Sequence, residues 1–130
     1  MKIIVGLAIG VLAHGAPAQA QAVPSPSVGV WRGTSSCLVR PSSCNNEVVV
    51  YRISRTQATD SVAVDARKVV DGQEVEMGVL GCGVDAQGRQ ITCSIPNGVW
   101  HFTIRGDSLV GELRLPDSTR VRDVRAARSR

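Results

Sequence analysis

The sequence predicts an all-β domain, an eight-stranded antiparallel up-and-down barrel. Beyond residue 22 no stretch shows the apolar period of an amphipathic helix. Short apolar runs instead recur roughly every nine to fifteen residues, separated by turn signals. The registers predicted for neighbouring hairpins also place the same apolar side chains on one face of the sheet. These three observations predict a meander of antiparallel strands.

Turn-forming residues divide the chain into eight segments. The breaks fall at residues 40–46, 55–60, 71–72, 87–88, 97–98, 106–107 and 116–118. Asn97-Gly98 is the strongest of these signals, because Asn-Gly is typical of the type I′ turn of a two-residue hairpin. The predicted strands cover residues 29–38, 47–54, 61–70, 75–84, 90–95, 99–105, 108–115 and 119–126.

Two adjacent turns predict the same apolar face for the strand 99–105. A turn centred on Asn97-Gly98 sets Cys93 opposite Phe102, and a turn at Gly106-Asp107 sets Phe102 opposite Gly111. An aromatic ring that covers a strand glycine is a known stabilising arrangement. Both hairpins place three apolar side chains on one face, namely Trp100, Phe102 and Ile104.

The same face extends towards the N-terminus. A hairpin around Gln87-Gly88 sets Val84 opposite Ile91 and Cys82 opposite Cys93. In the strand 75–84, Val75 and Met77 alternate out of phase with Leu80, Cys82 and Val84. One extra residue, a β-bulge at Gly78-Val79, would bring both sets onto the same face. With that bulge, Val64 lies opposite Cys82 and Val70 lies opposite Val75.

Eight strands with short connections leave two exposed edges unless the sheet closes. Closure into a barrel removes these edges, so the barrel is the favoured architecture. The alternative is an open sandwich of two sheets.

The first residues predict export. Lys2, an apolar run at residues 3–13 and a small-residue stretch at 15–22 follow the order of a secretory signal peptide, with cleavage after Ala20 or Ala22. The apolar run is too short to span a membrane as a helix, so no anchor is expected after cleavage. The predicted organisation is a signal peptide at 1–22, a flexible arm at 23–28, the barrel at 29–127 and a basic tail at 128–130. The protein is then secreted or periplasmic.

Four cysteines remain after cleavage. An even number in an exported domain predicts disulfides. Cys37 with Cys44 and Cys82 with Cys93 are favoured, since each pair flanks its own turn, and each short loop contributes about 2–3 kcal/mol. A zinc site is the alternative, but the chain lacks a C-x-x-C spacing. No metal and no cofactor are therefore expected.

Charge and motifs exclude several function classes. The net charge of +4 comes from the last strand and tail, where no aromatic residue accompanies the arginines, so no nucleic-acid partner is expected. His101 is the only histidine of the mature chain and is predicted to lie outside the barrel. No nucleophile or phosphate-loop motif occurs. Glu74 and Glu76 are read as surface ion-pair residues, with an acid pair of glycosidase type as a remote alternative. We expect no enzyme.

The first and last strands resemble the calycin group, the lipocalins and avidin-like proteins. Gly29-Val30-Trp31 matches the G-x-W opening of that group, whose final strand carries an arginine over the tryptophan. The resemblance implies a barrel whose base is closed by Trp31 with Arg120, Arg122 or Arg125. It further implies binding of a small apolar ligand or, as in the periplasmic inhibitor branch, of a protein. The chain departs from lipocalins in its short mature length and in the absence of a helix after the barrel.

Two functions follow from this fold. The first is a monomeric binder of a small apolar ligand, with a cavity between four aromatic side chains: Trp31, Tyr51, Trp100 and Phe102. The second is a protein-interaction module, such as an inhibitor of an extracytoplasmic hydrolase, that presents the loop at 40–46 or the N-terminal arm. A secreted domain whose partner leaves no mark in the sequence is a third possibility.

Overall fold

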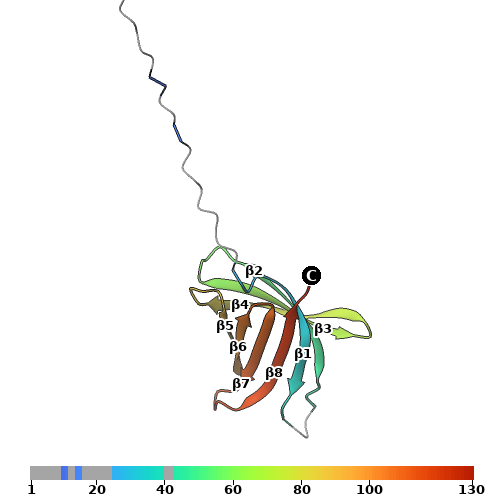
Figure 1. The fold of residues 1–130 in the computed structure, drawn as a ribbon. Coiled ribbons are helices and arrows are strands. Elements are labelled where there is room, and N and C mark those ends of the chain that lie inside the picture. The colour runs from blue at the N-terminus through green and yellow to red at the C-terminus, as the bar shows by residue number, and fades with distance from the viewer. Residues whose placement is uncertain (1–9, 12–13, 16–24, 40–42) are drawn as a thin grey trace, which may run out of the picture.

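The computed structural model describes residues 10–11, 14–15, 25–39 and 43–130 (Figure 1). Most of the predicted signal peptide, including both cleavage positions, lies outside the described residues. Eight strands form a closed barrel in which every neighbouring pair is antiparallel and β8 returns to β1. The predicted barrel is confirmed and the sandwich is wrong. The strands are β1 Gly29–Cys37, β2 Glu47–Arg55, β3 Ser61–Val70, β4 Gln73–Val84, β5 Gln90–Ile95, β6 Gly98–Arg105, β7 Ser108–Arg114 and β8 Arg120–Arg128.

The hairpin between β6 and β7 has the predicted register. Phe102 lies opposite Gly111 and Ile104 lies opposite Leu109. A Cβ atom on Gly111 would lie 2.6 Å from a ring carbon of Phe102, so glycine is what leaves room for the ring against β7. Gly106 begins the turn with a φ of 57°, in the left-handed region that glycine adopts without strain.

The hairpin between β5 and β6 is shifted by two residues from the prediction. Cys93 lies opposite Trp100 rather than Phe102, and the two-residue loop is Pro96-Asn97. Proline fixes φ near −65° and has no N–H, so Pro96 belongs in the loop and not in the ladder. Asn97 does not have a positive φ, and the predicted type I′ turn is therefore wrong. A shift of two residues preserves the predicted apolar face.

The hairpin between β3 and β4 contains the predicted bulge in a different place. Asp71 and Gly72 both have positive φ, as a type I′ turn requires, and they set Val70 opposite Gln73. The tight turn starts β4 two residues earlier than predicted. The register then shifts at Ala66/Arg67, which leaves Met77 as the extra residue in place of Gly78-Val79. As a result Val64 lies opposite Leu80 and not Cys82.

The contact between β4 and β5 is short. These strands pair only at Gly83 with Thr92 and at Val84 with Ile91. The disulfide between Cys82 and Cys93 extends this contact by one step, with 4.5 Å between the Cα atoms. Beyond the disulfide, the β4 residues towards the β3–β4 turn pair with no residue of β5, and we call this unpaired stretch the split between β4 and β5.

The residues before β1 seal one end of the barrel, which we call the closed end. Ser27 is fully buried, and the indole N–H of Trp31 donates to its carbonyl oxygen at 2.9 Å. The guanidinium of Arg128 donates to the carbonyl oxygens of Val28 at 2.9 Å and of Pro26 at 2.6 Å. Residues 25–28 are thus part of the fold instead of the flexible arm that we predicted. The last strand likewise extends to Arg128, one residue beyond the predicted barrel boundary.

Within the described residues, no helix is long and apolar enough to cross a membrane.

Candidate functional site

An apolar cavity of about 190 Å³ lies inside the barrel and is open to solvent. It is bounded by β2, β3, β4 and β6, beside the split between β4 and β5. The bulge at Met77 and the bare backbone of Gly78 help to make the space, since no side chain from Gly78 fills it. Its lining residues are Tyr51, Val64, Ala66, Met77, Gly78, Leu80, Trp100 and Phe102.

Three aromatic rings form one wall of the cavity. Trp100 and Phe102 lie two residues apart on β6, with parallel rings whose centroids are 5.6 Å apart. Tyr51 from β2 meets Phe102 edge to face at 5.5 Å. Such pairs favour a fixed ring geometry. This wall is therefore preformed before any ligand enters.

The predicted ligand residues separate into two groups. Tyr51, Trp100 and Phe102 line the cavity together, whereas Trp31 is fully buried at the closed end and does not reach it. The prediction missed the lining residues from β3 and β4. The alternation of side chains predicts several of them on the inner face. Met77 was missed because the bulge was predicted at Gly78-Val79, whereas Met77 itself is the extra residue.

Tyr51 supplies a hydroxyl group to the aromatic wall. Its side chain is 4% exposed, and burial raises the pKa of the phenol well above its ordinary value, although the positive charge of Arg122 opposes part of the shift. Desolvation acts in this direction because it disfavours the charged phenolate. Tyr51 is accordingly a neutral hydroxyl at any physiological pH.

Tyr51 is the only tyrosine of the chain, so its ionisation can be followed directly. We expect the tyrosinate absorbance of the native protein to stay low at about pH 11, whereas the chain unfolded in guanidinium titrates near pH 10. Because the pKa is raised in the folded state, its stabilising effect is present below about pH 10 and is lost as the pH rises above that value. Tyr51→Phe should abolish the band. Coincident native and unfolded titration curves would contradict the burial of the hydroxyl.

The arginine that covers Trp31 is Arg128, and the sequence prediction of Arg120, Arg122 or Arg125 is wrong. The guanidinium carbon of Arg128 lies 4.3 Å from the centre of the Trp31 ring, and the two residues are directly paired between β1 and β8. A planar guanidinium stacks well on an indole. The misassignment arose because we placed Arg128 in the tail, beyond the last predicted strand.

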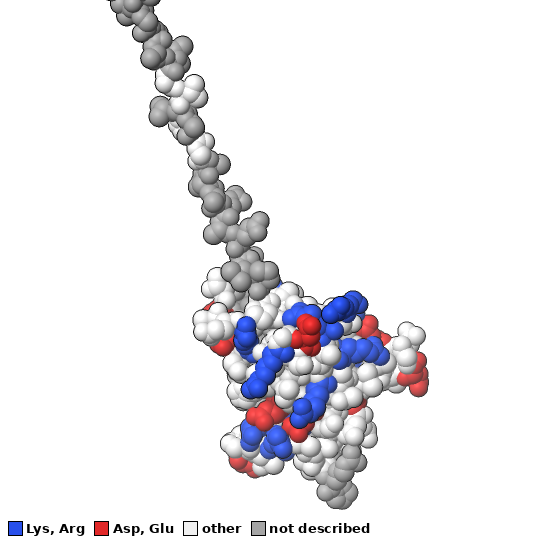
Figure 2. All heavy atoms as spheres, in the orientation of Figure 1, with Lys and Arg blue, Asp and Glu red and all other residues white. Residues whose placement is uncertain are grey.

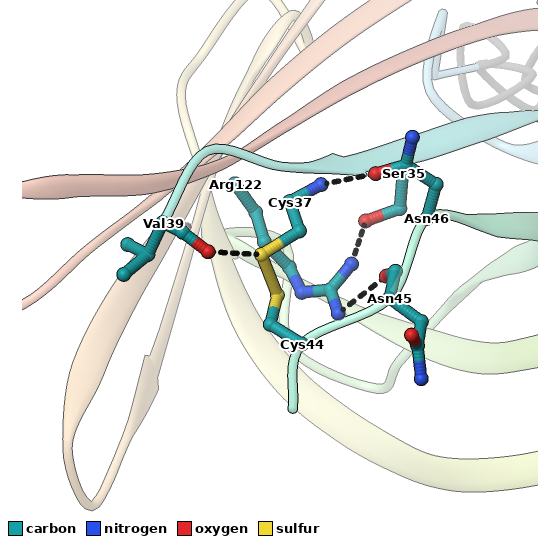
Figure 3. Close-up of a disulfide and its surroundings, with 7 residues drawn as sticks. All are labelled: Ser35, Cys37, Val39, Cys44, Asn45, Asn46 and Arg122. Carbon is teal, nitrogen blue, oxygen red and sulfur yellow. Dashed lines mark hydrogen bonds between the residues drawn. A yellow bond between two sulfur atoms is a disulfide. The ribbon is translucent and has the colours of Figure 1, made fainter. Parts of the chain in front are cut away.

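The other three arginines act elsewhere. Arg120 forms an ion pair with Asp123 at 3.5 Å, and Arg125 is exposed on the outer face of the barrel. Arg122 points to the opposite end of the barrel from Trp31, where it donates to the hydroxyl of Ser35 and to the carbonyl oxygen of Asn45, both at 3.0 Å (Figure 3). Its role there is to hold the end of the β1–β2 loop.

Both predicted disulfides are present. Cys37 and Cys44 bridge the β1–β2 loop, and the backbone N–H of Cys37 donates to the side chain of Asn46 at 2.9 Å (Figure 3). Residues 40–42 of this loop, which we considered as an inhibitor segment, lie outside the described residues. No cysteine in the described part of the chain is free.

Several charged groups outside the barrel form ion pairs. Basic and acidic side chains are interleaved on the face that Figure 2 shows. Arg52 binds Glu74 through two hydrogen bonds of 2.7 and 3.1 Å, which hold the pKa of Glu74 below its usual value. A general acid needs the opposite shift, so Glu74 does not suit the glycosidase alternative. Glu76 lies opposite Arg67 and His101 is exposed beside Thr92. The described residues contain no cluster of three potential metal ligands.

The chain resembles a solved structure in its fold. No protein-family description and no curated protein match the chain. Among solved structures, it is similar to a crystal structure of zebrafish ileal bile acid-binding protein complexed with cholic acid, at 18% identity and a TM-score of 0.42, over 81% of this chain and 100% of that chain. A similarity at this level carries no argument about ligand or family. The barrel architecture rests on the strand pairing described above.

Proposed function

We propose that this protein is a non-enzymatic, monomeric carrier of a small apolar ligand outside the cytoplasm. The observation that carries the proposal is the open cavity with its aromatic wall of Tyr51, Trp100 and Phe102. Ligand sites are typically concave, apolar and furnished with a few polar groups. The hydroxyl of Tyr51 and the indole N–H of Trp100 are such groups within an otherwise apolar wall.

Export supports the same proposal. Two disulfides are typical of an oxidising compartment. The N-terminal pattern with cleavage after Ala20 or Ala22 supplies the route, and the mature chain then begins shortly before the sealed residues 25–28. The secreted or periplasmic location is tested by N-terminal sequencing of the protein recovered from the medium and from the periplasm.

Filling the cavity is expected to abolish ligand binding. Ala66 lines the cavity, so Ala66→Phe places a ring in the space that a ligand needs. With 1-hexanol as the probe, calorimetric titration should show at least about a tenfold loss of affinity, since the buried apolar contacts are replaced by the new side chain.

Ala63→Phe is the matched control. Ala63 lies on the outer face of the same strand, opposite Gly81, and should leave hexanol affinity within about twofold of the native value. Equal hexanol binding by Ala66→Phe and the native protein would show that the cavity is not the ligand site.

A further inference from the structure

The cavity is smaller than the usual binding site for a drug-sized ligand. About 190 Å³ accommodates about six groups of the size of a water molecule. Drug-sized ligands occupy sites of about 300 Å³ or more. A ligand much longer than six carbons must therefore extend beyond the cavity.

The inner face of the β3–β4 hairpin continues the cavity wall outwards. Ala66 and Gly78 are paired and both line the cavity. The next pair on this face is Lys68 with Val75. The pair after that, beside the turn, is Val70 with Gln73. The β3–β4 hairpin projects from the side of the barrel in Figure 1.

Three apolar side chains on this face are exposed, and we call them the hairpin ledge: Val70, Val75 and Met77. Their exposed fractions are 44%, 42% and 45%. Met77 belongs to both the ledge and the cavity, so the two surfaces are continuous. Lys68 lies between Val70 and Ala66 on β3, with its ammonium 3.9 Å from Glu47, and its alkyl stem adds apolar surface.

We propose that the ligand is an unbranched apolar chain, one end of which occupies the cavity while the remainder lies along the hairpin ledge. The inference rests on the proposed function and names its ligand class. A linear chain suits this path because it fits a narrow cavity and still follows an open surface. A rigid ring system too large for the cavity gains nothing from the ledge.

Chain length separates the two parts of the site. The test measures the affinities of 1-hexanol, 1-octanol and 1-decanol by calorimetry on the native full-length mature protein. Full burial of a methylene raises affinity about fourfold, and contact along one side of an open ledge should give about twofold. Decanol is thus expected to bind about 15-fold more tightly than hexanol.

Val75→Ser and Val70→Ser test the ledge without touching the cavity lining. Each should reduce the gain from hexanol to decanol at least twofold while hexanol affinity is retained. Val79→Ser is the matched control, because Val79 is 58% exposed on the same strand but lies on the outer face opposite Asp65. This variant should keep the native gain.

The outcomes distinguish the two proposals. Failure of every alkanol to bind overturns the proposed function itself. Hexanol binding with no gain for decanol, or a gain that Val75→Ser leaves intact, overturns only the ledge. Sedimentation velocity on the native protein and on Val75→Ser completes the test. A dimer that this substitution dissociates would assign the ledge to self-association and overturn the proposal.

Discussion

Gly33→Ala is expected to destabilise the barrel by roughly 3 kcal/mol or more, the upper end of the cost of overpacking. A Cβ atom on Gly33 would lie in direct collision with the carbonyl oxygen of Arg125 and 2.5 Å from the Cα of Ala126. Both obstacles are backbone atoms of β8, so no side-chain rotation relieves the clash. The strands β1 and β8 must separate at their point of closure.

Thermal unfolding followed by circular dichroism measures this effect. A loss of this size lowers the melting temperature of a domain of about a hundred residues by roughly 12 °C or more. Gly83→Ala is the control, because no atom lies within 4 Å of the corresponding Cβ position. It should change the free energy of unfolding by less than about 1 kcal/mol. If Gly33→Ala melts like Gly83→Ala, the close approach of β1 and β8 is not as described.

Arg128→Ala is expected to cost about 3–5 kcal/mol. The substitution removes the guanidinium stacked on Trp31 and the donors to the carbonyl oxygens of Val28 and Pro26. Each of these partly buried acceptors left without a donor costs about 1 kcal/mol, the lower end of the range for buried groups, and the lost stacking on the buried indole costs about 1–2 kcal/mol more. The ion pair with Asp107 contributes little, because that aspartate is well exposed.

Arg125→Ala serves as the comparison for this prediction. Arg125 is on the same strand but is exposed, so its removal should change stability by less than about 0.5 kcal/mol. Chemical denaturation of both variants with urea gives the two free energies of unfolding. Equal values would mean that Arg128 does not close the barrel.

Side-chain parity predicts most of the fold, because a strand slip of one residue would turn every apolar side chain outwards. Trp100, Phe102 and Leu80 are on the interior side as predicted, even though two hairpins are shifted. A slip of two residues preserves parity, so parity cannot detect it. The loop conformations decide it instead, through Pro96 in one hairpin and through Asp71-Gly72 in the other.

The candidate site is less accessible to sequence analysis than the fold. The aromatic residues of the wall are recognisable because they alternate with polar residues on predicted strands. The cavity itself depends on the bulge at Met77 and on the length of the split between β4 and β5, which are properties of three strands together. Arg128 was missed for a related reason, since only its pairing with β1 shows that it belongs to the barrel.

The seam between β1 and β8 also constrains how the chain folds. Arg128 binds the backbone of Val28 across 100 positions of the sequence. Contacts of such high separation form slowly, because loop-closure entropy must be overcome first. The closed end is therefore completed late in folding, when β8 pairs with β1.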